Sequence, residues 1–336
     1  MGDPSPGAGS APPLPSLAIV NPVAGEGRGA AVWRLVEPAV RALFPELAVE
    51  TTVALGHAEA LGTAWARFNP GGVLLVLGGD GTVHEVVNGL AREGAGVTLG
   101  VLPAGTGNDF ARNTGIPLEP VAAVVRLAFA LRRAPGGGPA RHEEGTGAPV
   151  RRVDLGRVQF MEWGGESRTR VFLNSVSVGV GPRANRLAGR MRRFVPGRLR
   201  YAAGGVAALF SGSPERYRVT AGEQVRFAGE ALNLTIANCA CFGGGLRISP
   251  ASSPDDGVLE QVVIGRLGLI RALLALGRLY AGTHVGMRGV SVTPVREALR
   301  IENGGGRMLV EADGQEFIAA GALTVEILPG ALDLLR

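Results

Sequence analysis

The stretch LGGDGTVHEVVNGL, residues 77–90, joins an apolar run to a helix-like pattern through a turn that holds three glycines and one acid. The preceding residues 73–77 read VLLVL, a run without alternation that is typical of a strand covered on both faces in a parallel sheet. After the turn, Thr82 and Glu85 are placed as a capping box. Apolar residues then recur at helical spacing: Val83, Val86, Val87 and Leu90. The stretch therefore predicts a strand, a tight turn and a helix.

The same pattern occurs twice more in the first half of the chain. An apolar run at 16–20 leads into the turn NPVAGEG at 21–27, and another at 97–102 leads into PAGTGND at 103–109. Alternating strands and helices predict an open, doubly wound α/β sheet, whose ligands bind beyond the carboxyl ends of the strands. We therefore expect all three glycine-rich turns to lie along one rim of that sheet.

Such a rim can bind phosphate without lysine, a residue that the chain lacks altogether. Glycines let backbone N–H groups approach an anion, and helix N-termini add a favourable partial charge. Asp80 does not fit a plain phosphate cradle, because its carboxylate repels polyphosphate unless a cation or a transferable proton lies between them. The acid therefore indicates chemistry as well as binding. Neither a Walker-type phosphate loop nor a dinucleotide fingerprint is present, which argues against P-loop enzymes and dinucleotide dehydrogenases.

The composition of the 336 residues indicates a globular protein with a basic balance of charge. Hydrophobic residues make up 46% of the chain, the formal net charge is +5 and the pI is about 10.1. This charge permits an anionic partner such as a nucleotide or an acidic lipid. Cys239 and Cys241 are too close for an ordinary disulfide, and the four scattered histidines indicate no metal cluster. A reducing cytoplasm is the simplest compartment for such a chain.

The second half of the chain reads as mostly strand. Apolar residues alternate around 225–236, 308–312 and 323–327, as they do in half-buried strands. One helical pattern, at about 267–281, interrupts them. No window of the chain reads as a membrane-spanning helix or a signal peptide.

Motifs along nearly the whole chain resemble those of the diacylglycerol kinase and sphingosine kinase superfamily of lipid kinases. They are NPVAGEG (21–27), GGDGTVHEVVNGL (78–90), LPAGTGNDFARNTGIP (102–117), LNSVSVGVG (173–181), FGGGLRISPASSPDDGVLE (242–260) and VEADG (310–314). The resemblance implies an NAD-kinase-like, doubly wound α/β domain followed by a β-sandwich-like domain, with the active site in the cleft between them. NAD kinases and sugar phosphofructokinases also carry a GGDG-like turn, but the first and third motifs favour the lipid kinases.

On this basis we expect a disordered tail over 1–15 and a nucleotide-binding α/β domain over 16–133, completed by 329–336. A flexible linker loop is expected over 134–150, where glycine and proline are frequent. A β-rich lipid-substrate domain is expected over 151–328.

The resemblance also implies site residues. Asp80 and Asp313 are expected to be the catalytic acids. Asp256 matches the family's magnesium acid, with backbone oxygens near Ser253 and Val258 as further ligands, a set that suits this hard cation. The expected ATP-binding residues are Asn21, Pro22, Ala24, Gly25, Gly27, Thr52, Gly78, Gly79, Gly81, Thr82, Glu85, Gly105, Thr106 and Asn108.

The late motif of the family, DGE, reads DGQ in this chain. Gln315 stands where the second acid belongs, and Glu316 follows it. Because glutamine cannot accept a proton at neutral pH, Asp80, Asp313 or Glu316 must do so if the third position normally serves as base.

The resemblance implies an ATP- and Mg²⁺-dependent kinase that phosphorylates a lipid hydroxyl, with diacylglycerol or a related lipid as the acceptor. A sphingoid-base kinase and a catalytically weak nucleotide-binding regulator are the alternatives. Residues 181–210 mix arginines with large apolar side chains, which is typical either of a segment at an anionic membrane or of a solvated basic loop beside a core helix. We therefore expect a cytoplasmic protein in peripheral contact with anionic membrane. The arginines lack regular aromatic neighbours, so no nucleic-acid partner is expected.

Overall fold

The computed structural model describes residues 14–94, 96–132, 150–191, 195 and 199–336. The expected tail, apart from its last two residues, and the expected linker, apart from residue 150, lie outside this part of the chain. So do 192–194 and 196–198 within the expected interfacial segment.

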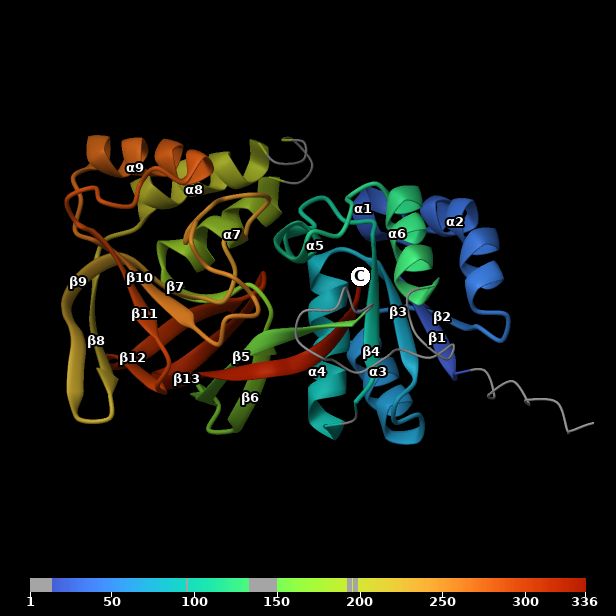
Figure 1. Ribbon diagram of the computed structural model, residues 1–336. Helices are drawn as coiled ribbons and strands as arrows, with labels where there is room; N and C mark the ends of the chain where they lie inside the picture. Colours follow the sequence, from blue (N-terminus) through green and yellow to red (C-terminus); the bar gives the residue numbers. More distant parts are fainter. Residues whose placement is uncertain (1–13, 95, 133–149, 192–194, 196–198) are drawn as a thin grey trace, which may run out of the picture.

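The first half alternates strands and helices, as its sequence predicts (Figure 1). Its elements are β1 (Ser16–Val20), α1 (Ala24–Gly27), α2 (Gly29–Leu43), β2 (Ala48–Thr51), α3 (His57–Phe68), β3 (Val73–Gly78), α4 (Asp80–Glu93), β4 (Thr98–Pro103), α5 (Asp109–Thr114) and α6 (Pro120–Arg132). Strands β4, β3, β1 and β2 pair in this order, all parallel. Helices α2 and α6 pack together, as do α3 and α4, and β1, β3 and β4 are buried along their whole length.

The second half is built mainly of antiparallel strands. Its elements are β5 (Val150–Glu162), β6 (Ser167–Phe172), β7 (Ser175–Gly179), α7 (Val180–Arg190), α8 (Leu199–Ser211), β8 (Glu215–Ala221), β9 (Gln224–Ala237), β10 (Leu259–Gly265), α9 (Leu269–Ala281), β11 (Val290–Val295), β12 (Leu299–Ala312) and β13 (Gln315–Leu335). Figure 1 shows α7, α8 and α9 gathered at one edge of this half.

The long strand β13 belongs to both halves. It pairs antiparallel with β12 over 315–325 and with β5 along most of its length. Its last residues, Asp333 to Leu335, pair parallel with β4 of the first half. One continuous sheet therefore carries both halves.

Three local predictions were wrong. Helix α4 begins at Asp80 with Gly79 as its N-cap and no side-chain cap, because Thr82 instead accepts a hydrogen bond from Asn21. The sequence pattern missed β2, whose side chains are mostly exposed and therefore leave no apolar run. The one helix expected in the second half, at about 267–281, is present as α9, but α7 and α8 also interrupt the strands and the sequence pattern did not predict them.

Candidate active site

The three glycine-rich turns meet at the carboxyl ends of β1, β3 and β4, where their backbones touch. A Cβ atom on Gly105 would lie 2.4 Å from the Cα atom of Gly79, and one on Gly25 would lie 2.2 Å from the carbonyl oxygen of Ala104. Only glycine permits such an approach. The Asn21 side-chain amide donates to Thr82 Oγ1 at 2.8 Å and ties the first turn to the second.

These turns line a cavity of about 890 Å³, the turn cavity, which is within the range of nucleotide-sized ligands. The expected ATP-binding residues in its wall are Asn21, Pro22, Ala24, Gly25, Thr52, Gly79, Gly81, Thr82, Glu85, Gly105 and Thr106. Gly27, Gly78 and Asn108 are not part of this wall. Asn108 instead shapes the third turn, because its side chain accepts from the backbone N–H of Gly105 at 2.9 Å and donates to its carbonyl at 3.0 Å.

The second half closes the turn cavity. Gln315 of the DGQ motif belongs to the lining, and so do three residues that the motifs do not name: Asn185, Arg200 and Tyr201. Arg200 is the one cation among the lining residues that the structure describes, and its guanidinium lies 3.2 Å from the carboxylate of Glu26 in the first turn. In the sequence, Arg200 was noticed only as one of the arginines within 181–210.

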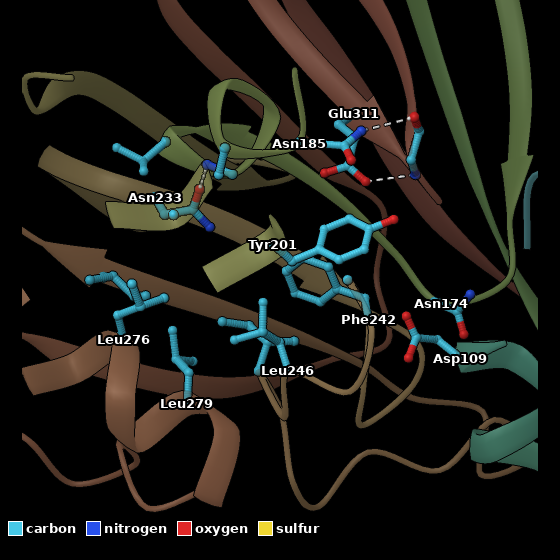
Figure 2. A pocket seen from close by; sticks show the side chains of 18 of the residues that line it. Asp109, Asn174, Asn185, Tyr201, Asn233, Phe242, Leu246, Leu276, Leu279 and Glu311 are labelled. Carbon is cyan, nitrogen blue, oxygen red and sulfur yellow. Dashed lines mark hydrogen bonds between the residues drawn. The ribbon is translucent and has the colours of Figure 1, made fainter. Parts of the chain in front are cut away.

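A second cavity, the apolar cavity, lies inside the C-terminal half between α7, α8, α9 and the loop before β10 (Figure 2). Figure 2 shows Leu246, Leu276 and Leu279 at one end and polar side chains at the other. The polar end holds Asp109, Asn174 and Glu311. No arginine is present among the described residues that line this cavity.

The two cavities meet. They share the lining residues Asp80, Gly107, Asn185, Tyr201, Asp313 and Gly314. Groups bound in the two cavities would therefore face each other beside the first residue of α4.

Asp80 has the properties of a proton acceptor at this junction. Its Oδ1 atom accepts a hydrogen bond from the backbone N–H of Phe110 at 3.1 Å, and the backbone of Asp109 is a second donor to this carboxylate. Burial, followed by the neighbouring carboxylate of Asp109, raises the pKa of Asp80 from 3.8 to about 7. A carboxylate with such a pKa can accept a proton near neutral pH.

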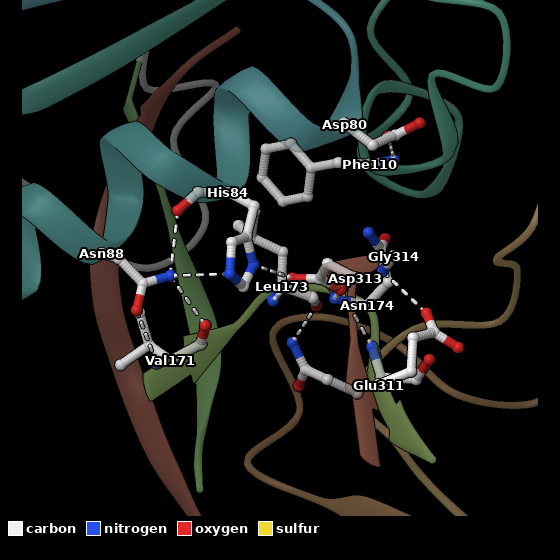
Figure 3. Close-up of polar contacts among 12 residues, drawn as sticks. Asp80, His84, Asn88, Phe110, Val171, Leu173, Asn174, Glu311, Asp313 and Gly314 are labelled. Atoms are coloured by element: carbon white, nitrogen blue, oxygen red, sulfur yellow. Dashed lines mark hydrogen bonds and ion pairs between the residues drawn. The ribbon is translucent and has the colours of Figure 1, made fainter. Parts of the chain in front are cut away.

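Asp313 is a buried anchor (Figure 3). It opens the two-residue turn Asp313–Gly314 between β12 and β13, where both residues have positive φ, as expected for an Asp-Gly hairpin. Its Oδ1 atom accepts from the N–H groups of Asn174 and Ser175 at 2.8 and 3.2 Å. Its Oδ2 atom accepts from the N–H group of Leu173 at 2.6 Å and lies 3.0 Å from His84 Nδ1. These four contacts use the acceptor positions of the carboxylate.

His84 of α4 is oriented from its other side by Asn88. The Asn88 amide nitrogen lies 3.2 Å from His84 Nε2, and it also contacts the carbonyl oxygens of His84 and Val171. Because an ionised carboxylate only accepts, Nδ1 carries the proton toward Asp313. The side chain of His84 is buried, with 3% of its surface exposed.

Glu311 is an acid that the motif pattern did not single out. It lines the apolar cavity and accepts hydrogen bonds from the N–H group of Gly314 at 2.7 Å and from Ser177 Oγ at 3.2 Å. Burial raises the pKa of Glu311 to about 7. Glu316 is different: it forms an ion pair with Arg186 at 2.7 Å and lines neither cavity.

The expected magnesium residues lie in the turn before β10, outside the linings of both cavities. Asp256 Oδ1 accepts from the backbone N–H of Val258 at 3.0 Å, while Ser253 Oγ donates to Asp255 at 2.6 Å. The turn is attached to β5, because Asp154 accepts from the N–H group of Gly257 at 2.7 Å. Within the described residues, no group of three or more His, Cys, Asp or Glu side chains has the arrangement of a metal site.

Comparison with known proteins agrees with this geometry. Residues 15–134 match the diacylglycerol kinase catalytic domain, and residues 174–336 match the YegS C-terminal NAD kinase beta sandwich-like domain. The "probable lipid kinase YegS-like" of Pseudomonas fluorescens is 30% identical over 263 residues, which are 75% of this chain and 72% of that protein. The chain belongs to the diacylglycerol kinase-like family of lipid kinases. It is therefore a phosphotransferase of the kind that uses a nucleotide and a lipid.

Other members of this lipid kinase family are similar over most of their length. The "diacylglycerol kinase" of Mycobacterium tuberculosis is 28% identical over 78% of this chain and 76% of its own. A crystal structure of a diacylglycerol kinase from Bacillus anthracis has the same fold, with a TM-score of 0.69 and 22% identity over 96% of this chain and 97% of that one. Yeast NADH kinase aligns with a TM-score of 0.50 and 10% identity over 98% of this chain and 86% of that one. The NAD-kinase-like fold is thereby confirmed.

In the part of the lipid kinase that the structure describes, no helix combines the length and apolarity needed to cross a bilayer.

Proposed function

We propose that the protein transfers the γ-phosphoryl group of ATP, with Mg²⁺, to a hydroxyl group of diacylglycerol or a closely related lipid. The observation that carries this proposal is the meeting of the turn cavity and the apolar cavity at Asp80. A phosphoryl donor in the first cavity and a lipid hydroxyl in the second would approach each other beside a carboxylate. Phosphoryl transfer depends on this kind of positioning more than on a covalent nucleophile.

The turn cavity supports ATP as the donor. Glycine-rich backbone at the ends of β1, β3 and β4 presents N–H groups to an anion, and Arg200 adds one positive charge. Thr52, at the end of β2, also lines the turn cavity and lies outside the glycine-rich turns. The cavity therefore extends beyond the part that phosphates alone would occupy.

The carboxylates at the junction fit a magnesium ion. Asp109 supplies a hard oxygen ligand beside Asp80, and a divalent cation held there would relieve the repulsion between the two buried carboxylates while Asp80 stays available as the base. Bound there, Mg²⁺ would neutralise negative charge on the phosphates during transfer. The turn before β10 offers one carboxylate and backbone carbonyls, from Ser253, Asp256 and Val258. Because these residues line neither the turn cavity nor the apolar cavity, a cation held by them would stabilise the turn.

Asp80 is the base in this proposal, and Asp313 is a positioning residue. The acceptor positions of Asp313 are taken by three backbone N–H groups and His84, so none remains for a substrate hydroxyl. Asp80 accepts one hydrogen bond from Phe110 and lines both cavities. The change from DGE to DGQ therefore leaves an acid in place for the reaction.

The apolar cavity supports a lipid acceptor with an uncharged headgroup. Leucine side chains line its inner end, and Asp109 and Glu311 at its polar end repel an anionic headgroup. The same two acids favour an amine, and this observation keeps a sphingoid base as the second candidate acceptor. We also expect a cytoplasmic protein in peripheral contact with anionic membrane, and no nucleic-acid partner.

A panel of lipid acceptors in mixed micelles with radiolabelled ATP tests this proposal. We expect labelled phosphate to appear in the product of diacylglycerol, and only when Mg²⁺ is present. Label in a sphingoid base would instead favour that lipid as the acceptor. Nucleotide binding without label in any lipid would instead show a regulator that has lost catalysis.

A further inference from the structure

Helices α8 and α9 expose large apolar side chains along their outer faces. On α8 these are Leu199, Val206 and Phe210, which recur at helical spacing, and Phe210 is 65% exposed. On α9, Ile270 and Leu274 lie one turn apart and are 76% and 58% exposed. We call these five side chains the α8–α9 face. The two helices pack together along one edge of the C-terminal half (Figure 1).

The same two helices form a wall of the apolar cavity with their inner faces. Gly205 and Leu209 of α8 and Leu276 and Leu279 of α9 line that cavity. One pair of helices therefore separates the acceptor cavity from the exposed apolar side chains. A lipid that enters the cavity from a bilayer has the shortest path if this edge of the molecule lies on the bilayer.

The charges around α9 match an anionic surface. Between residues 261 and 296 there is no Asp or Glu, and five arginines are present in this segment: Arg266, Arg271, Arg278, Arg288 and Arg296. Arg271 and Arg278 are exposed on the helix itself, beside Ile270 and Leu274. In the part of the chain that the structure describes, neither of the two forms an ion pair.

Three of the four arginines that the structure describes within 181–210, the segment that the sequence singled out, form ion pairs with carboxylates. Arg183 pairs with Glu215, Arg186 with Glu316 and Arg200 with Glu26. Guanidinium groups already paired with carboxylates contribute little net attraction to a membrane. Arg271 and Arg278 of α9 are therefore exposed cations that remain available to anionic lipid.

We propose that the α8–α9 face, with Arg271 and Arg278, is the surface by which the protein docks on an anionic bilayer. The five apolar side chains enter the interfacial region, while the arginine stems lie along it with their guanidinium groups at the phosphates. This inference rests on the proposed function only for the reason to visit a bilayer. Binding itself is measurable without catalysis.

Sedimentation with vesicles tests the surface in the full chain. The vesicles are phosphatidylcholine alone and phosphatidylcholine mixed with phosphatidylglycerol, and no ATP is added. Wild-type protein is expected to bind the anionic vesicles more tightly. The double variant Ile270→Asp, Leu274→Asp is expected to lose about tenfold or more in partitioning, because two apolar insertions are replaced by charges. Arg271→Ala with Arg278→Ala is expected to remove the preference for anionic vesicles.

Two controls separate docking from folding and catalysis. Phe68→Asp changes another exposed aromatic side chain, at the end of α3 in the other half, and is expected to bind vesicles as the wild type does. A dispersed short-chain diacylglycerol is expected to be phosphorylated equally by the wild type and the Ile270, Leu274 variant, since neither residue lines a cavity.

The outcomes distinguish the two proposals. Equal vesicle binding by the wild type and both double variants would overturn the docking surface, even if lipid phosphorylation is observed. A wild-type dimer in solution that the Ile270, Leu274 variant converts to monomer, with vesicle binding unchanged, would assign the face to self-association and also overturn it. If the vesicle binding follows the prediction but no lipid is phosphorylated, the proposed function is refuted and the docking surface is not.

Discussion

The Nδ1 atom of His84 lies 3.0 Å from the Oδ2 atom of Asp313, and this contact joins the helix that follows the GGDG turn to the β12–β13 hairpin of the other half. Both side chains are almost completely buried. The contact fixes the distance between the wall that carries Asp80 and the wall that carries the apolar cavity. In the proposed mechanism, Asp313 acts on the reaction through the position of α4.

Asp313→Asn is expected to loosen this junction. Whichever way the amide is oriented, its NH₂ group faces backbone N–H donors that the carboxylate now satisfies. We expect unfolding free energy to fall by roughly 2–4 kcal/mol, as for other broken buried networks. Chemical denaturation measures it. Glu316→Gln, which removes a half-exposed ion pair with Arg186, is the matched control and should change stability by less than about 1 kcal/mol. If the two variants lose the same unfolding free energy, the buried network contributes no more to stability than the exposed ion pair does.

Asp80→Asn is expected to stabilise the protein while it slows transfer. The folded-state pKa of Asp80, about 7, is above the usual 3.8, so the folded protein holds a proton that the unfolded chain releases. Stability is therefore lost as pH rises from about 4 to about 7 and stays low above that range. The variant removes this penalty, which is at most about 4 kcal/mol. Thermal unfolding should show a gain at about pH 8 that shrinks toward pH 4; a gain that is independent of pH contradicts the assignment.

Leu276→Trp is expected to fill the apolar cavity from α9. The larger ring occupies space that an acyl chain needs, so kcat/KM for long-chain lipid should fall about tenfold or more while KM for ATP is unchanged. Leu35→Trp, on the exposed face of α2, controls for the substitution itself. If phosphorylation of long-chain lipid is unaffected, the lipid binds elsewhere.

Arg200→Ala is expected to weaken ATP binding. The Arg200 side chain is 11% exposed, and its guanidinium is the positive charge in the described wall of the turn cavity. Loss of one charge-assisted contact to phosphate should raise KM for ATP about tenfold. Arg200→Lys should recover part of the loss, whereas Arg34→Ala, exposed on α2, should have no effect. An unchanged KM would place the phosphates away from α8.

The sequence was most informative where local chemistry determines structure. Glycines at 25, 79 and 105 are required because the turns touch, and this requirement makes the turns visible as motifs. Buried parallel strands such as β3 appear as unbroken apolar runs. These two signals suffice for the doubly wound half and for the place of Asp80.

The remainder of the candidate site depends on contacts between distant parts of the chain. Glu311, Tyr201 and Leu276 come from β12, α8 and α9, and no short motif brings them together. The contact of His84 with Asp313 joins residues 229 positions apart. Thr82 could serve as part of a capping box, but the nearby Asn21 side chain uses its hydroxyl instead. Local sequence patterns do not show which of several possible hydrogen-bond partners a side chain such as Thr82 will use.

The most direct test of the account is the rate of phosphoryl transfer from ATP to diacylglycerol by Asp80→Asn, measured at saturating lipid with nucleotide affinity determined in the same preparation. Asparagine keeps the shape and the hydrogen bond from Phe110 but cannot accept the hydroxyl proton. The account predicts that kcat falls by about 10²–10⁴-fold while the Kd for ATP is nearly unchanged. A variant that retains wild-type kcat would contradict it.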